Sequence, residues 1–350
     1  MIKMAPVVKE LGKRGIEFCF ITTGQHYDYE MSMQFIEELN LPRPTVSFRL
    51  GNSKPASQIG EMMARLEPAL ERYGCRVLLI QGDTNSMLAA ALTGVKLGLR
   101  VAHVEAGLRS YDWQTPEEHN RRMVDHVSDI LFAPTKISEQ NLMNEQVHGK
   151  IFVTGNTVVD AVNLYLPIAL RVSNMMKQIP FRKYCFATIH RKESVDSPQI
   201  LGNLVGVLTE AGIPIVFPVH PRTQKRLVEF GLYQKLACSP HIHLLNPLGY
   251  FDSLVLMRNS ELILTDSGGL QEEATVPSIR KPVIVLRPST ERPEAVQAGF
   301  AKVAGVRKEE VLSTMKAMLE NPPLLPDCSP FGDGNAAGRI VRTVLDDLTR

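Results

Sequence analysis

Short apolar segments alternate with amphipathic segments along nearly the whole chain. Several apolar segments are almost continuous runs, as expected for parallel strands that helices cover on both faces. The segments between them, such as residues 86–98 and 252–260, have the spacing of crossover helices. This alternation predicts doubly wound α/β domains. The predicted strands lie within residues 17–24, 77–83, 100–107, 130–135, 151–156, 184–190, 214–220, 242–248, 261–269 and 282–289.

The chain has 350 residues, which is too long for one core and suits two domains. The break is expected within residues 161–184, before the strand that begins near Tyr184. We therefore expect an α/β protein with two Rossmann-like domains that face a central cleft.

The first fifteen residues, "MIKMAPVVKELGKRG", predict a helix that ends at Gly12 or Gly15. Parallel α/β domains usually begin with a strand, because that strand is central to the sheet. We therefore expect the first strand of the N-terminal domain to be missing. Either another segment fills its place, or the chain lacks residues that the natural protein has.

Composition narrows the class of protein. With 44% hydrophobic and 22% charged residues, the composition is typical of a globular protein. The net charge of +2 gives no evidence for a nucleic-acid-binding surface. Five cysteines without C-x-x-C spacing indicate reduced thiols in the cytoplasm and neither a disulfide framework nor a metal site. No apolar stretch is long enough to span a membrane, and no signal peptide is evident.

Polar residues collect where the predicted strands end. Ligands of open parallel sheets bind beyond the carboxyl ends of the strands, so this coincidence predicts a cleft lined by carboxylates, imidazoles and guanidinium groups. The pairs are Gln25 and His26, Asp83 and Thr84, His103 and Glu105, His190 and Arg191, His220 and Arg222, Asp266 and Ser267, and Glu291 and Arg292.

The stretch "ELILTDSGGLQEEATVP" combines a buried-type strand, a turn of small residues and the start of a helix. Glycines there allow a ligand to approach the backbone, and a helix N-terminus favours an anion. A nucleophilic serine is disfavoured, because the G-x-S-x-G elbow is absent. We therefore expect Ser267 to bind phosphate, with simple helix capping as the alternative. Glu272 and Glu273 are expected in the first turn, where they either complement the helix dipole or hold the ribose hydroxyls.

Taken together, these segments resemble the non-hydrolysing UDP-N-acetylglucosamine 2-epimerase family. The resemblance runs from Ile2 to the C-terminal segment 331–341. The matching segments, in order, are "IKMAPV", "TGQH", "QGDT", "HVEAGLRS", "PEEHNR", "TGNTVVDA", "PVHPR", "TDSGGLQEEA", "TERPEAVQAG" and "FGDGNAAGRIV".

The resemblance implies a fold like that of the GT-B glycosyltransferases, with the last helix crossing back. Residues 1–165 with 331–350 would then form the N-terminal domain, which carries the catalytic carboxylates, and residues 166–330 the UDP-binding domain. It implies reversible conversion of UDP-GlcNAc to UDP-ManNAc by elimination of UDP, through 2-acetamidoglucal, with no cofactor or metal. A homodimer and a cytoplasmic role in cell-surface polysaccharide biosynthesis are also implied.

The resemblance also assigns roles to individual residues. Those implied for catalysis are Asp83, Glu105, Glu117 and His220; those implied for binding the UDP-sugar are Lys3, Ser267, Gly268, Glu273 and Arg292; those implied for a second, activating UDP-GlcNAc are Gln25, His26, Glu118 and Arg191.

Each of these residues also has an ordinary structural interpretation. Asp83 would cap a helix, Glu105 would pair with Arg109, and Glu117 would be a first-turn glutamate. Arg292 would pair with Glu294 at a strand end. His220 would be structural, Lys3 a solvated lysine, and the residues of the second site would reflect surface polarity.

The chain departs from the family pattern at its beginning. The pattern places a strand and the sequence Gly-Thr-Arg-Pro-Glu before "IKMAPV", so the phosphate-facing arginine is absent here. A chain that truly starts at Met1 is expected to have a weakened fold and impaired UDP binding. The rival activities are epimerisation of a UDP-2,3-diacetamido-uronic acid, glycosyl transfer from a UDP-sugar, hydrolysis to free ManNAc, and UDP-sugar binding without catalysis.

Overall fold

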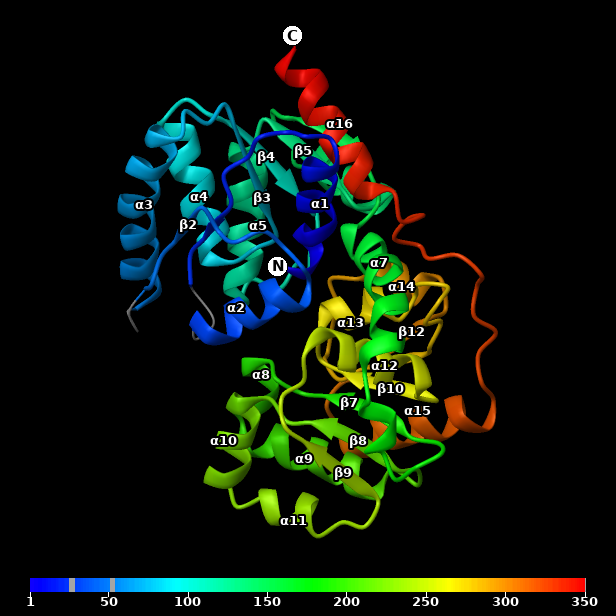
Figure 1. Cartoon of the computed structure of the whole chain (residues 1–350). Helices are drawn as coiled ribbons and strands as arrows, with labels where there is room; N and C mark the ends of the chain where they lie inside the picture. Colours follow the sequence, from blue (N-terminus) through cyan, green and yellow to red (C-terminus); the bar gives the residue numbers. More distant parts are fainter. Residues whose placement is uncertain (25–28, 51–53, 350) are drawn as a thin grey trace. The chain divides into compact units, whose positions relative to one another are not determined.

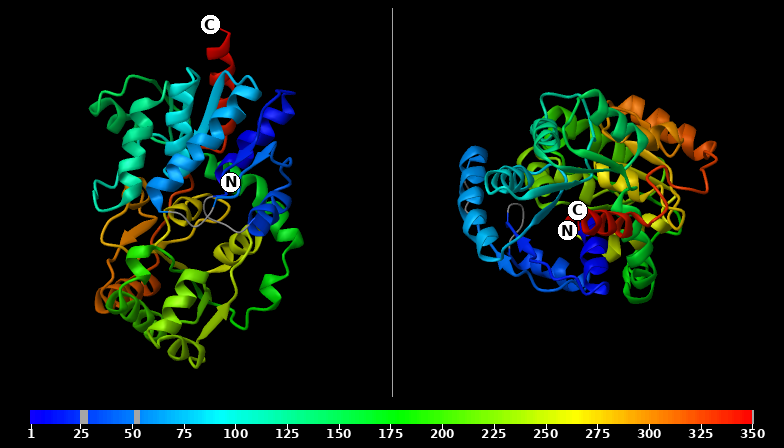
Figure 2. Two further views of the ribbon diagram at one scale, coloured as in Figure 1. Left: turned by 90° about the vertical axis from the view of Figure 1, so that its left-hand side faces the viewer. Right: turned by 90° about the horizontal axis from the view of Figure 1, so that it is seen from above.

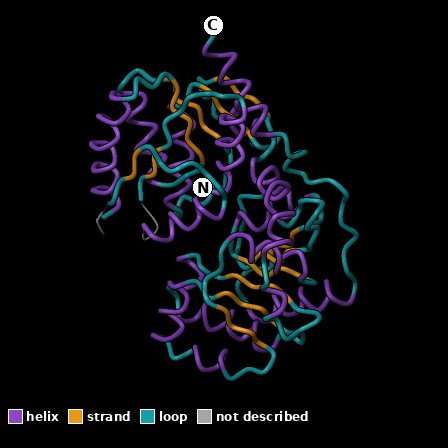
Figure 3. The backbone as a smooth tube through the Cα atoms, viewed as in Figure 1, coloured by secondary structure: helices purple, strands orange, loops and turns teal. Residues whose placement is uncertain are grey.

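The computed structural model describes residues 1–24, 29–50 and 54–349. The chain forms two compact units, of which the first comprises Met1–Ala161 with Phe331–Arg350 and the second Val162–Pro330. Figure 1 follows the chain through both, and Figure 3 shows the strands of each unit in its interior with helices around them. The predicted α/β class with two Rossmann-like domains is confirmed.

The second unit is built on one six-stranded parallel sheet with the order β12-β11-β10-β7-β8-β9. Its strands are β7 (Cys185–Thr188), β8 (Ile215–Pro218), β9 (Ile242–Leu245), β10 (Leu262–Thr265), β11 (Val283–Val285) and β12 (Ala301–Val303). Its helices after α7 (Thr157–Val172) are η2 (Met175–Lys177), α8 (Lys192–Val195), α9 (Pro198–Glu210), α10 (Pro221–Glu229), α11 (Tyr233–Ala237), α12 (Tyr250–Asn259), α13 (Gly268–Glu273), α14 (Pro293–Gln297) and α15 (Lys308–Glu320).

The strand order of this sheet reverses direction between β7 and β10. These two strands are almost completely buried, and they pair in parallel from Leu262 and Cys185 to Thr265 and Thr188. The hydroxyl groups of Thr188 and Thr265 lie 2.7 Å apart at the carboxyl end of the pair. In doubly wound sheets the ligand crevice forms at such a reversal, because the connections on its two sides leave in opposite directions.

The first unit contains the four-stranded parallel sheet β3-β4-β5-β6 and, within the described part of the chain, a separate two-stranded ladder of β1 and β2. Its strands are β1 (Ile21–Thr22), β2 (Val46–Ser47), β3 (Val77–Gln81), β4 (Arg100–Val104), β5 (Ile130–Ala133) and β6 (Lys150–Val153). Its helices are η1 (Ile2–Met4), α1 (Ala5–Lys13), α2 (Tyr29–Glu38), α3 (Pro55–Arg72), α4 (Asn85–Lys96), α5 (Pro116–Val127), α6 (Lys136–Asn144) and α16 (Ala336–Leu348), with α7 (Thr157–Val172) crossing into the second unit.

The first and last helices of the chain lie side by side in the first unit, as Figure 2 shows from above. Val7 of α1 and Ile340 of α16 share one apolar cluster with residues of β4 and β5. The carboxylate of Asp160 accepts the backbone N–H groups of Ala336 and Ala337, at 3.2 and 2.9 Å, which satisfies two unpaired donors at the start of α16.

The helix predicted at the N-terminus is present as η1 and α1. It ends at Lys13, and Gly15 follows with a φ of 66°, so Gly15 and not Gly12 terminates it. All ten predicted strands are present, although the first is reduced to Ile21–Thr22. The short strands β2 and β12 were not predicted. Within the described residues, no helix combines the length and the apolar composition needed to cross a bilayer.

Candidate active site

Glu105 lies at the carboxyl end of β4, where the chain turns through an unusual backbone conformation. Its φ is 74°, a left-handed value that is uncommon for residues other than glycine and is often found at functional sites. The buried carboxylate of Glu105 accepts hydrogen bonds from the ammonium group of Lys3 and from the side-chain amide of Gln81. Lys3 is therefore paired and is not a solvated lysine.

Asp83 is the neighbour of Glu105 on the next strand. It follows Gly82, which has a φ of 86° and whose missing Cβ would lie 3.9 Å from Oε2 of Glu105. The two candidate carboxylates therefore follow the ends of two adjacent strands. In the register of β3 and β4, Glu105 follows Val104, which pairs with Gln81, and Asp83 lies one position beyond Gly82. Asp83 is not the N-cap of α4, because that position belongs to Thr84. The capping interpretation of Asp83 is therefore wrong.

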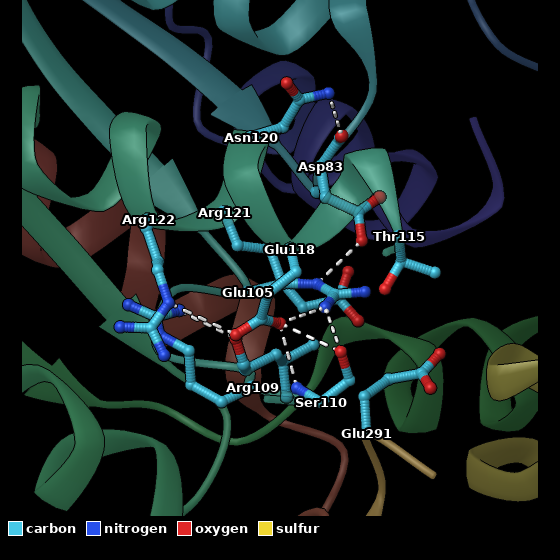
Figure 4. A network of polar contacts seen from close by, with 12 residues as sticks. Asp83, Glu105, Arg109, Ser110, Thr115, Glu118, Asn120, Arg121, Arg122 and Glu291 are labelled. Carbon is cyan, nitrogen blue, oxygen red and sulfur yellow. Dashed lines mark hydrogen bonds and ion pairs between the residues drawn. The ribbon is translucent and has the colours of Figure 1, made fainter. Parts of the chain in front are cut away.

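The carboxylate of Asp83 is held by helix α5. The guanidinium Nε of Arg121 donates to Oδ2 of Asp83 at 2.9 Å, and the side-chain amide of Asn120 donates to its backbone carbonyl, also at 2.9 Å. Figure 4 shows both contacts. Neither Asn120 nor Arg121 was predicted as a site residue.

Glu117 lies in the first turn of α5, one residue after Pro116. Residues three and four positions apart share a helix face, so Glu117 lies on the same side of α5 as Asn120 and Arg121, which contact Asp83. The side chain of Glu117 is half-buried, and among the residues described here it makes no hydrogen bond or ion pair.

Glu118 is fully buried, so surface polarity does not explain it. Its carboxylate accepts the backbone N–H of Ser110 at 2.9 Å and hydrogen bonds from Arg121 at 2.7 Å and Arg122 at 3.2 Å. Burial raises the pKa of Glu118, but the N–H of Ser110 and the charge of Arg121 oppose it, and the net pKa is below the usual value. Gln25 and His26, assigned to the same second site, lie outside the described residues.

The expected pairing of Glu105 with Arg109 is wrong. Arg109 donates to both carboxylate oxygens of Glu145, at 2.9 and 2.7 Å, and its Nη1 lies 2.8 Å from Oδ2 of Asp125. Because the left-handed conformation of Glu105 turns the chain, its side chain joins Lys3 instead. His103 has a structural role, since its Nδ1 lies 2.7 Å from the buried carboxylate of Asp125.

In the second unit, Asp266 organises the loop at the reversal of strand order. Its buried carboxylate accepts the backbone N–H of His190 at 2.9 Å and that of Arg191 at 2.8 Å. The side chain of Arg191 pairs with Glu291 at 3.1 Å, and Glu291 also pairs with Arg287 at 2.6 Å. The loop after β7 and the loop after β11 are thus tied together.

Ser267 is the N-cap of α13 and Gly268 is its first residue, whereas the sequence predicted a helix that starts at Leu270. The hydroxyl of Ser267 makes no capping hydrogen bond, so the simple capping interpretation is wrong. Gly268 cannot carry a side chain without displacing its neighbour, because a Cβ there would lie 2.7 Å from Oε1 of Glu291. The side chains of Glu291 and Arg292 therefore lie close to the backbone at the start of this short helix.

Two expectations about α13 are corrected. The helix has only six residues, so Glu272 and Glu273 lie in its last turn and not in its first. Dipole complementation is therefore excluded as their role. Arg292 pairs with the fully buried Glu272. Glu273 is also buried.

His220 lies immediately before α10 and caps it. Its Nδ1 accepts the backbone N–H of Arg222 at 3.2 Å, and its ring centroid is 5.7 Å from that of His190. Desolvation lowers the pKa of His220, and the charges of His190 and Arg222 lower it further, against the opposite effect of Asp266. The unit thus presents an imidazole with a lowered pKa at the start of α10, beside His190.

Sequence reasoning could have found Arg121, because its spacing of four and three residues from Glu117 and Glu118 in a predicted helix indicates a charge pair. Asn120 carries no comparable signal. Within the described ranges, no group of three or more His, Cys, Asp or Glu side chains is arranged to hold a metal ion.

Each unit by itself offers groups for a distinct kind of chemistry. The first unit has three carboxylates suited to proton transfer or to stabilising a developing positive charge. The second unit has backbone N–H groups and guanidinium groups suited to phosphate.

Comparisons with known proteins agree with this chemistry. A model of the UDP-N-acetylglucosamine 2-epimerase family matches residues 9–345. The UDP-N-acetylglucosamine 2-epimerase of Methanocaldococcus jannaschii is 43% identical over 351 residues, which cover 98% of this chain and 95% of that protein. The UDP-2,3-diacetamido-2,3-dideoxy-D-glucuronate 2-epimerase of Pseudomonas aeruginosa is 34% identical over 327 residues, with coverage of 92% and 89%.

Solved structures give the same result. The crystal structure of the M. jannaschii UDP-GlcNAc 2-epimerase in complex with UDP-GlcNAc and UDP superposes with a TM-score of 0.92 at 42% identity. The match covers 99% of this chain and 96% of that one. Since the family model spans nearly the whole sequence and close relatives agree over their full length, the chain belongs to the UDP-N-acetylglucosamine 2-epimerase family.

Proposed function

We propose that this chain is an isomerase that interconverts UDP-GlcNAc and UDP-ManNAc. The observation that carries the proposal is a match over 98% of the chain to a UDP-N-acetylglucosamine 2-epimerase. The placement of Asp83 and Glu105 at adjacent strand ends, with Glu117 on the helix face that contacts Asp83, supports it.

The proton on C2 of the sugar is barely acidic, so direct inversion is difficult. In the proposed route a base removes this proton, the C2–H electron pair forms the C1–C2 double bond, and the C1–O bond breaks with its electrons on UDP. The product is 2-acetamidoglucal. A proton then adds to C2 from the other face, and UDP returns to C1. Keeping both fragments bound avoids the entropic cost of a second encounter.

The three carboxylates have different partners, and we assign their roles from this difference. The carboxylate of Asp83 pairs with Arg121, and that of Glu105 pairs with Lys3. These two are suited to stabilise positive charge that develops on the sugar ring. Glu117 makes no hydrogen bond or ion pair with the described residues, so its carboxylate is available to contact the sugar. We assign proton transfer at C2 to Glu117.

The residues proposed to bind UDP are those that the resemblance implies. We propose that Ser267 and Gly268 bind phosphate through backbone N–H groups at the start of α13, and that Arg292 and Lys3 supply positive charge. Glu273 is assigned to the ribose hydroxyls. Positive side chains that are already oriented by carboxylates, as Arg292 is by Glu272, lose little freedom when an anion binds.

His220 is assigned to the oxygen that leaves with UDP. Because its pKa is lowered, the ring is neutral near neutral pH, and because Nδ1 accepts the N–H of Arg222, the proton resides on Nε2. That N–H can donate to a diphosphate oxygen and so stabilise the negative charge that forms there.

One rival activity is supported by a specific observation, the 34% identity to a UDP-2,3-diacetamido-2,3-dideoxy-D-glucuronate 2-epimerase. The test is to incubate the protein with UDP-GlcNAc in deuterium oxide and follow the sugar by NMR. Formation of UDP-ManNAc with deuterium at C2 supports the proposal. Turnover of only the diacetamido-uronic substrate, free ManNAc, UDP release that requires an acceptor, or binding without exchange would each contradict it in favour of a named rival.

Three further assignments belong to the proposal. A second UDP-GlcNAc as activator is assigned to Gln25, His26, Glu118 and Arg191, of which Arg191 contacts Glu291. A homodimer is proposed from the resemblance and is tested by light scattering. A cytoplasmic location is proposed because the five cysteines, all within the described residues, are free thiols; fractionation of the source cells tests it.

A further inference from the structure

Two consecutive residues of α5 hold opposite ends of Asp83. Arg121 donates Nε to the carboxylate at 2.9 Å, and Asn120 donates its side-chain amide to the backbone carbonyl at 2.9 Å. One contact orients the side chain and the other fixes the main chain, so the whole residue is tied to one helix turn (Figure 4). The two contacts span 38 and 37 residues of sequence.

Arg121 is itself held in place by a buried partner. Its Nη1 donates to Glu118 at 2.7 Å, and Glu118 is 0% exposed while Arg121 is 4% exposed. A charge at such depth requires a partner, because an unpaired buried ion is very costly. The guanidinium therefore bridges two carboxylates in a fixed fork, and its direction toward Asp83 is set by Glu118.

Glu118 extends this support into the loop before α5. It accepts the N–H of Ser110 at 2.9 Å and the Nε of Arg122 at 3.2 Å. Arg122 in turn donates to Glu145 at 2.6 Å, which also binds Arg109. Asp83 thus stands at the exposed end of a chain of alternating charges, since 31% of its side-chain surface is accessible while the others are more buried.

Asn120 adds a second attachment. Its side-chain amide also donates to Oδ1 of Asn85 at 3.2 Å, the first residue of α4. The turn between β3 and α4, which carries Asp83, is therefore fastened to α5 at two successive points. A turn fastened in this way keeps its carboxylate within the narrow range of positions that catalysis requires.

We propose that Arg121 and Asn120 are positioning residues for Asp83 and act on the reaction through it. This inference rests on the proposed function, because it assigns Asp83 to the reacting sugar. It predicts that loss of Arg121 lowers kcat while KM is retained, since displacement of a catalytic group by about 1 Å can cost about 100-fold in rate.

A double-mutant cycle separates positioning from a general structural effect. The variants are Arg121→Gln, Asp83→Asn and the pair combined, with Arg65→Gln as the control, because Arg65 forms an exposed i,i+4 pair with Glu61 on α3. We expect Arg121→Gln to lower kcat about 10- to 100-fold in the wild-type background and to have no effect in the Asp83→Asn background. An equal loss in both backgrounds, or no loss at all, would overturn the proposal.

Two additional variants test the same role in case Arg121→Gln does not fold. Arg121→Lys keeps the charge but not the fork, and Asn120→Ala removes the second attachment without leaving a buried charge. Each is expected to give a smaller loss of kcat than Arg121→Gln and to depend on Asp83 in the same way. If neither lowers kcat in a folded protein, the positioning role is rejected.

A second readout does not require catalysis. With aspartate labelled by carbon-13 at the carboxyl group, the signal of Asp83 is assigned by its absence in Asp83→Asn. This signal is expected to move in Arg121→Gln and to stay in place in Arg65→Gln. An unmoved signal in Arg121→Gln rejects the contact. If wild-type protein shows the contact but does not epimerise UDP-GlcNAc, the proposed function fails and the positioning of Asp83 stands.

Discussion

The carboxylate of Asp266 accepts the backbone N–H of His190 at 2.9 Å, across the two strands where the sheet order of the second unit reverses. The same carboxylate accepts the N–H of Arg191 at 2.8 Å. A single buried side chain thus shapes the loop after β7, and with it the position of the His190 ring beside His220. The aspartate of the "TDSGG" segment is therefore structural support for the loop.

Replacement of this aspartate should destabilise the second unit. In Asp266→Asn the side chain keeps one oxygen acceptor and gains an NH₂ group. The NH₂ group cannot accept a hydrogen bond, so one of the two backbone N–H groups is left without an acceptor or the two must share one oxygen. We expect a loss of about 1–3 kcal/mol in the free energy of unfolding, the cost of leaving a buried donor unsatisfied. Urea unfolding measures it. Asp196→Asn, which removes a half-exposed pair with Arg226, is the control and should change stability by less than about 1 kcal/mol.

Replacement of each of the two glycines at the start of α13 by alanine should have different effects on UDP binding. A Cβ at Gly268 would lie 2.7 Å from Oε1 of Glu291, whereas the nearest atom to a Cβ at Gly269 is Oγ of Ser267 at 3.9 Å. Gly268→Ala must therefore displace the carboxylate of Glu291, which pairs with Arg191 and Arg287, while Gly269→Ala makes an ordinary contact. We expect weaker UDP binding by calorimetry in the first variant only. Equal affinities in both would show that the loop moves freely or that UDP binds elsewhere.

Removal of the candidate carboxylates should abolish turnover with little effect on UDP affinity. Glu117→Gln is expected to lower kcat by about 10²–10⁴-fold, the usual contribution of an acid or base group. Asp83→Asn and Glu105→Gln are each expected to lower it by about 10²–10³-fold, the usual contribution of a group that stabilises charge in the transition state. Calorimetry with UDP provides the matched measurement of binding. The assignment of proton transfer predicts in addition that Glu117→Gln loses exchange of the C2 hydrogen with solvent. Retained exchange in that variant would move the base to another residue.

Stability of the first unit should fall in acid. The pKa of Glu118 is below its usual value of 4.5 and that of Asp125 is below its usual value of 3.8; burial opposes both shifts, and the partners named above outweigh it. Because the folded state holds these protons less tightly than the unfolded state, the stabilisation is present above the usual pKa values. It is lost as the pH falls through the lowered ones.

Thermal unfolding measured from neutral pH downward tests this. The melting temperature is expected to decline below about pH 4.5, and the decline should be shallower in Glu118→Gln, which has no carboxylate to protonate at that position. An identical decline in wild type and variant would exclude Glu118 as a source of the acid sensitivity.

Strands that consist of a continuous apolar run could be predicted from the sequence. β7 and β10 are continuous buried segments, so their existence followed from hydrophobicity, whereas β2 and β12 have only two and three residues and give no periodic signal. The helix at the N-terminus was predicted correctly, but its end required the positive φ of Gly15.

Side-chain pairing was harder to predict, because it depends on local backbone geometry. The expected pair of Glu105 and Arg109 failed because Glu105 adopts a left-handed conformation, which no residue type other than glycine signals. Glu272 was placed in the first turn because the helix was expected to start at Leu270, whereas it starts at Gly268. The support of Asp83 by Asn120 joins segments 37 residues apart, and one sequence contains no information on such a contact.

The central claim is that the bond between the sugar and UDP breaks during epimerisation, and isotopic labelling of that bond tests it most directly. UDP-GlcNAc is prepared with oxygen-18 in the bridge between C1 and the β-phosphate and is incubated with the protein, and the remaining substrate is analysed by phosphorus NMR. Elimination frees the β-phosphate to rotate before UDP returns, so the label should spread into non-bridging positions. If UDP-ManNAc forms while the label stays entirely in the bridge, the bond does not break and the elimination mechanism is contradicted.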